Sequence, residues 1–175
     1  MNTTKKLCIA LFCCAILASG CATVQSFIKS SFPYTSTVVL PASAQVGQTN
    51  SAISSASSFD EVFGNTSGND YVRDVRAESA RITAVSPADQ NLGTIKSIKL
   101  YLSNKTGHEV MIASRNDISE NIGSPLVLDV DKSRFIDEYI KGTNLRIRME
   151  YILRNNLKQD VSVKASVSFS SLPVK

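Results

Sequence analysis

The thiol groups of cysteine are the most reactive side chains in the sequence, and they are unevenly distributed. All four lie within the first 21 residues, at Cys8, Cys13, Cys14 and Cys21. A thiolate can attack a substrate, bind a metal ion or form a disulfide. Because no cysteine follows Cys21, the rest of the chain can carry out none of this chemistry. We expect that part to be stabilised by its hydrophobic core alone.

Three short motifs together resemble the catalytic set of the penicillin-binding proteins and β-lactamases. They are SFIK at 26–29, SGN at 67–69 and KTG at 105–107, in the order that those enzymes use. The enzymes place their serine at the start of a buried helix and the last motif on a neighbouring strand. Here Ser26 lies five residues after Cys21, and Lys105 falls in a predicted turn. We therefore expect no catalytic serine and no enzymatic activity.

Residues that bind metal ions are sparse or poorly spaced. His108 is the only histidine, and it lies in a predicted turn, which favours a solvated loop residue. Asp129, Asp131 and Ser133 resemble the start of a calcium-binding loop, but Arg134 stands where such a loop needs glycine. Capping of a helix explains Asp131 and Ser133 better. The sequence predicts no metal ion and no cofactor.

Two arginines and a lysine form a candidate binding patch. Arg146 and Arg148 alternate on one predicted strand, and Lys164 lies on the strand that we expect to pair with it. On one shared face the three would make a small cationic patch near Glu150. The interpretation that we favour is a solvated face with cross-strand ion pairs. The alternative is an anionic partner, such as a polysaccharide or a lipid head group.

The first 20 residues have the three zones of a signal peptide. Lys5 and Lys6 give a basic start, an apolar run covers 7–17, and small residues fill 18–20. A helix needs about 20 apolar residues to cross the hydrocarbon core, so the run is too short for a permanent anchor. The motif LASGC at 17–21 resembles the lipobox of bacterial lipoproteins, with the leucine one place further from the cysteine than usual.

This resemblance implies a covalent lipid anchor. In that family a peptidase cleaves before the cysteine, here between Gly20 and Cys21, and the thiol carries a diacylglyceryl group. Residue 22 is alanine and not an acid that would favour the inner membrane, so we expect the outer membrane of a bacterial cell envelope. The sequence does not decide between the periplasmic and the outer face of that membrane. The alternative is an ordinary signal peptide with an incidental cysteine.

Charge argues against a nucleic-acid partner. Cleavage would remove Lys5 and Lys6, leaving 17 of the 19 basic residues against 15 acidic ones, a net charge of +2. Basic and acidic residues are interleaved and form no basic stripe. The expected partners are the membrane, through Cys21, and another envelope protein or a polysaccharide.

Alternation of apolar and polar residues predicts an antiparallel β domain at 34–175, after a lipidated tether at 21–33. The expected strands are 35–40 at a sheet edge, a weak one around Ile53, 71–85, a hairpin over 97–114, 126–130, 145–153 and 161–169. A phase change near Glu78 and Ser79 indicates a bulge in the long strand. We expect the last two strands to form a second antiparallel hairpin.

The remaining elements are helical. A helical turn is expected at 59–63 and a short helix at about 132–141. The apolar residues of that helix, Phe135, Ile136, Tyr139 and Ile140, are expected to pack on the sheet. Seven or eight strands with one helix predict a mainly β fold, specifically a single immunoglobulin-like or related antiparallel β-sandwich.

The sequence thus favours a membrane-anchored envelope lipoprotein with a non-enzymatic binding or structural role through protein contacts. The alternatives are a carbohydrate- or lipid-binding module and, less favoured, a small hydrolase. Sandwich domains commonly carry binding sites on their loops or on one face. Oligomeric state stays open.

Overall fold

The structure is a computed structural model that describes residues 31–57, 72–104, 106–140 and 144–173. The predicted signal peptide, the lipobox-like motif at 17–21, the motifs at 26–29 and 67–69, and the predicted helical turn at 59–63 lie outside the described residues. No helix within the described ranges is long and apolar enough to cross a membrane.

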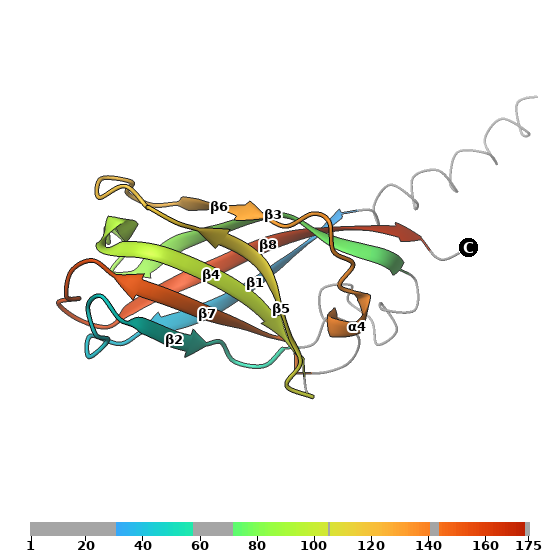
Figure 1. The fold of residues 1–175 in the computed structure, drawn as a ribbon, viewed down its shortest axis with the longest axis horizontal. Coiled ribbons are helices and arrows are strands. Elements are labelled where there is room, and N and C mark those ends of the chain that lie inside the picture. The colour runs from blue at the N-terminus through green and yellow to red at the C-terminus, as the bar shows by residue number, and fades with distance from the viewer. Residues whose placement is uncertain (1–30, 58–71, 105, 141–143, 174–175) are drawn as a thin grey trace, which may run out of the picture.

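The fold is mainly β, as the sequence predicts, and the eight strands among the described residues form one antiparallel sheet. The strands are β1 (Ser31–Leu40), β2 (Thr49–Ile53), β3 (Val72–Ser86), β4 (Ile95–Ser103), β5 (Glu109–Arg115), β6 (Leu126–Val130), β7 (Arg146–Leu153) and β8 (Val161–Pro173). A 3-10 helix, η2 (Leu92–Thr94), precedes β4, and α4 (Asp137–Ile140) precedes β7. The strand order is β1-β8-β3-β6-β5-β4-β7-β2. The sheet curls until it is nearly barrel-shaped (Figure 1).

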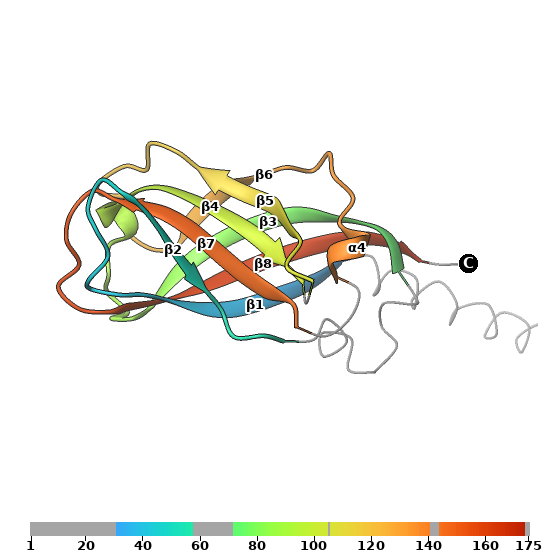
Figure 2. The same ribbon diagram turned by 60° about the horizontal axis from the view of Figure 1, so that its bottom comes forward.

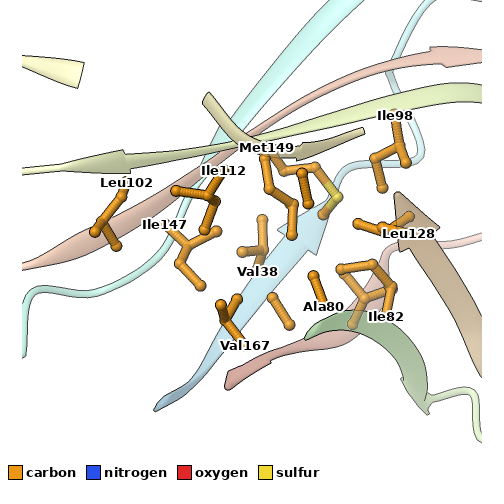
Figure 3. Packing of buried hydrophobic residues seen from close by; sticks show 14 of the residues in the cluster. Val38, Ala80, Ile82, Ile98, Leu102, Ile112, Leu128, Ile147, Met149 and Val167 are labelled. Carbon is orange, nitrogen blue, oxygen red and sulfur yellow. The ribbon is translucent and has the colours of Figure 1, made fainter. Parts of the chain in front are cut away.

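Two halves of the curled sheet enclose the core. The first half is β1-β8-β3-β6 and the second is β5-β4-β7-β2, joined where β6 pairs with both β3 and β5 (Figure 2). Successive residues of a strand point to opposite faces, so the apolar residues of one phase of each strand face inward and most of them are buried. Figure 3 shows side chains of the first half pointing toward those of the second: Val38, Ile82 and Val167 toward Ile112, Ile147 and Met149.

Most predicted strands are confirmed, including the bulge. The register between β3 and β8 shifts between Ala77 and Ser79, at the predicted phase change. β4 and β5 form the predicted hairpin, and β1 lies at an edge. However, β1 begins at Ser31, earlier than the predicted strand, because Pro33 lacks only an N–H group and an edge strand tolerates that loss. Residues 31–33 are therefore strand and not tether.

The second predicted hairpin is wrong. β7 pairs with β4 and β2, whereas β8 pairs with β1 and β3. The loop after Leu153 carries the chain from the second half of the sheet to the first. Alternation identifies which face of a strand is buried, but it does not identify the neighbouring strand.

The predicted helix is shorter than expected. It begins at Asp137 and not at 132, because the N–H of Ser133 donates to Oδ1 of Asp131 and closes a turn instead of a helix. Two hydrogen bonds from Ser133 also hold the pKa of Asp131 below its usual value. Ile136 and Ile140 are buried as predicted, but Phe135 is 51% exposed and does not join the apolar face.

The two ends of the sheet are named by the first and last residues of β1. At the Ser31 end, β1 and β3 begin and β8 finishes, since Ser31 pairs with Ser170 and Val72 pairs with Pro173. At the Leu40 end, β1 and β3 finish and β8 begins. Figure 1 shows α4 beside the Ser31 end.

Loops at the Leu40 end are held by one arginine. Arg154 donates from Nη1 to the carbonyl oxygen of Gly93 (2.9 Å) and from Nη2 to that of Ile118 (2.8 Å). The backbone N–H of Arg154 donates to the carbonyl oxygen of Thr94 (2.7 Å). Three segments distant in sequence are therefore joined where β7 ends.

Two buried tyrosines give a matched test of the core. The hydroxyl of Tyr34 is hydrogen-bonded to Ser57 Oγ (2.5 Å) and donates to the carbonyl of Leu145 (3.3 Å), whereas that of Tyr151 has no partner among the described residues. Burial also raises the pKa of Tyr151. A buried polar group without a partner costs about 1–3 kcal/mol. We expect Tyr151→Phe to leave the free energy of unfolding unchanged or higher.

Tyr34→Phe is the control and should lower the free energy of unfolding by about 1 kcal/mol, because it removes satisfied hydrogen bonds. Thermal unfolding of the two purified variants makes the comparison. A loss of stability in Tyr151→Phe as large as that in Tyr34→Phe would show that the Tyr151 hydroxyl is satisfied in solution.

Candidate functional site

The structure does not bring the three predicted cationic residues together. Arg146 and Arg148 lie on β7, whereas Lys164 lies on β8, where it is paired in register with Thr37 and Thr83. β7 and β8 belong to different halves of the sheet. Arg146 and Lys164 border separate surface hollows.

Arg148 is held by neighbouring acids. Its Nε lies 2.8 Å from Oε1 of Glu109, and its Nη2 lies 2.8 Å from Oε2 of the same carboxylate. Its guanidinium also lies 4.1 Å from the ring centroid of Tyr101, its register partner on β4. The Glu109 carboxylate raises the pKa of Arg148 further. This is the arrangement of cross-strand ion pairs that the sequence favours, and it leaves little charge for an anionic ligand.

The described residues that the sequence suggests as possible metal ligands also lie at the surface. His108 is exposed in the turn between β4 and β5. Asp129 forms an ion pair with Arg115 at 3.4 Å, and Asp131 forms one with Arg134 at 3.1 Å. Among the residues that the structure describes, no three histidine, cysteine, aspartate or glutamate side chains gather in a way that could hold a metal ion.

A second irregularity in β3 creates a different candidate site. The register between β3 and β8 shifts between Arg73 and Arg76, and Asp74 adopts a left-handed backbone with φ of 55°. Aspartate is among the few residues other than glycine that adopt this conformation readily. The shift takes Val75 out of the regular pairing with β8, so that its backbone polar groups need other partners.

These partners come from the first residue of α4 and the residue before it. The N–H of Val75 donates to Oδ2 of Asp137 (3.1 Å), and its carbonyl accepts from the N–H of Ile136 (2.9 Å). With Ile136 and Ile140 buried, the helix is fixed against β3. Phe135 is left on the outer side, where the guanidinium of Arg76 lies 4.1 Å from its ring centroid.

The Arg76–Phe135 hollow is the surface cavity that results, with a volume of about 400 Å³. Its lining includes Asp74, Arg76, Glu78, Lys132, Phe135 and Leu172. Lys132 and Glu78 form an ion pair across it. Phe135 and Leu172 are each 51% exposed. The hollow therefore combines two exposed apolar side chains with balanced charge.

The hollow lies at the Ser31 end of the sheet. Ser170 borders it, and Ser170 is the register partner of Ser31. Sequence reasoning missed this site because it assigned Phe135 to the core and did not extend the last strand to Leu172. Asp74 was the available signal, since aspartate is disfavoured inside strands and often marks an irregularity.

Comparison with known proteins adds no family assignment. No protein-family model matches the chain, and no curated protein matches it. Its function must therefore be inferred from its own residues.

Proposed function

We propose that this chain is a lipid-anchored protein of the bacterial cell envelope. The observation that carries the proposal is the motif LASGC at 17–21, which is separated from the start of β1 by only nine residues. Acyl chains on Cys21 hold the protein on the outer membrane, and the β domain has a non-enzymatic binding or structural role. The enclosed core at 31–173 supports this role because it gives a stable body without any disulfide.

The tether keeps the domain near the membrane. Nine residues span at most roughly 30 Å when fully extended. The lipid and the first residue of β1 are therefore separated by no more than about the thickness of a small domain. An anchored domain of this kind acts on partners at the membrane surface.

The finer fold assignment is part of the proposal. We infer that the curled sheet is an immunoglobulin-like or related sandwich, supported by its two four-stranded halves that face each other across one core. In such domains partners bind at loops, faces or free strand edges.

Protein contacts are preferred over a polysaccharide. β1 and β2 are the two ends of the described strand order, and an edge strand presents backbone groups to which a partner strand can pair. The polysaccharide alternative depends on the cationic patch, whose three members lie on two separate strands of different halves.

Membrane fractionation tests the proposal. We expect the native protein to sediment with membranes, to stay there through washes with high salt and alkaline carbonate, and to be released by detergent. Two or three acyl chains bind far more firmly than one, because each buried methylene contributes ~0.8 kcal/mol. Release by carbonate alone would contradict a covalent lipid anchor.

A further inference from the structure

We propose that the Arg76–Phe135 hollow faces the membrane and that Phe135 and Leu172 contact the bilayer at its headgroup region. This inference rests on the proposed lipid anchor and names the surface that the anchor presents. The occupant is the bilayer itself and not a partner protein.

The first argument is position. The anchored residue, Cys21, is joined by nine residues to Ser31, which pairs with Ser170 on the border of the hollow. The hollow is thus at the end of the sheet where β1 begins and β8 finishes; Figures 1 and 2 show this end of the two strands. The Leu40 end lies about 30 Å further away, because β1 has ten residues at ~3.3 Å each.

The second argument is the type of exposed side chain. Phe135 is the only aromatic residue among the large apolar side chains that are exposed in the described part of the chain. It shares the hollow with Leu172, which is exposed to the same extent. Phenylalanine and leucine are the residues with which membrane-surface proteins enter the boundary between headgroups and acyl chains.

The third argument is the charge around the two apolar residues. The four charged residues of the hollow, Asp74, Arg76, Glu78 and Lys132, sum to zero. Contact should therefore not require anionic lipid. The guanidinium of Arg76 lies 4.1 Å from the centroid of the Phe135 ring. This cation–π interaction stabilises the ring in its exposed position on the outside of the domain.

The anchor makes a weak contact sufficient. Once acyl chains hold Cys21 in the bilayer, the hollow meets the surface as an intramolecular event at high effective concentration. Two apolar side chains that would not bind a membrane alone can then set the orientation of the domain.

Single cysteine variants provide the test, because the native chain has no cysteine after Cys21 and the lipid occupies that thiol. Leu172→Cys and Phe135→Cys probe the hollow. Val39→Cys is the matched control, since Val39 is 49% exposed and lies near the far end of β1. Each full-length lipidated variant is labelled with an environment-sensitive fluorophore and reconstituted in phosphatidylcholine vesicles. Spin-labelled lipids then quench any fluorophore in the bilayer.

We expect quenching of about twofold at positions 172 and 135 and none at position 39, with blue-shifted emission only at the first two. Thermal unfolding of each variant verifies that the exposed substitutions leave the fold intact. Equal quenching at all three positions, or none at any, overturns the inference. Flotation of the vesicles separates the two proposals. Protein that floats without quenching at 172 disproves the contact alone, and protein that does not float disproves the anchor as well.

Discussion

Gly93→Ala is expected to lower the free energy of unfolding by about 3 kcal/mol, at the upper end of the usual cost of overpacking. A Cβ atom on residue 93 would lie 1.9 Å from the carbonyl oxygen of Glu120 and 2.4 Å from its carbonyl carbon. Both are backbone atoms, so no flexible side chain can move aside. The Glu120 carbonyl is also fixed, because it accepts a hydrogen bond of 2.6 Å from Nδ2 of Asn91.

The surrounding bonds prevent the Gly93 backbone from moving instead. Its N–H donates to Oδ1 of Asn91 (2.9 Å), and its carbonyl accepts from Nη1 of Arg154. The melting temperature should fall by roughly 10 °C, since 1 kcal/mol corresponds to about 2–4 °C in a domain of this size. Thermal unfolding followed by circular dichroism measures the change.

Gly47→Ala is the control for this prediction. Gly47 has a φ of +73° but no atom within 4 Å of a Cβ at that position, so alanine meets only backbone strain. That strain costs about 1 kcal/mol. If the two substitutions lowered the free energy of unfolding equally, the loop at 116–123 would have moved to admit the added methyl group. The close packing described at the Leu40 end would then be contradicted.

Cys21→Ser is expected to abolish lipid attachment and cleavage before residue 21. The hydroxyl of serine is a much weaker nucleophile than a thiolate and does not take up the diacylglyceryl group. Incorporation of an alkyne-bearing fatty acid should fall to background, and the protein should keep a larger apparent mass than the native one. Cys14→Ser is the matched control and should be labelled and processed normally, since Cys14 lies inside the apolar run. Normal labelling of Cys21→Ser would remove the basis of the proposed function.

The sequence predicts strands well where one face is buried. Val161, Val163 and Val167 of β8 alternate with polar residues, and all three are buried as expected. The phase change near Glu78 likewise corresponds to a real bulge. Both features are local consequences of the two-residue period of a strand.

Long-range pairing could not be predicted in the same way. β7 and β8 are adjacent in sequence and have the same alternation, yet they lie in opposite halves of the sheet. Any two amphipathic strands are compatible by pattern, and the choice between them depends on length, register and the packing of the whole core. For this reason the predicted grouping of Arg146, Arg148 and Lys164 has no counterpart in the structure.

The candidate site depends on irregular backbone, which sequence patterns describe poorly. The left-handed Asp74 frees Val75 to bind α4, and this places Phe135 outside the core. A helical pattern alone assigns Phe135 to the same buried face as Ile136. The proposed lipid attachment is the opposite case, because the prediction of Cys21 rests on five contiguous residues and needs no knowledge of the fold.

Intact mass spectrometry of the native protein, extracted from membranes with detergent, tests the central claim most directly. The predicted product begins at Cys21 and is heavier than residues 21–175 by a diacylglyceryl group, with or without a further acyl chain on the new amino terminus. A product that retains residues 1–20, or one with a free thiol at Cys21, would contradict the lipid anchor and the membrane-facing orientation inferred from it.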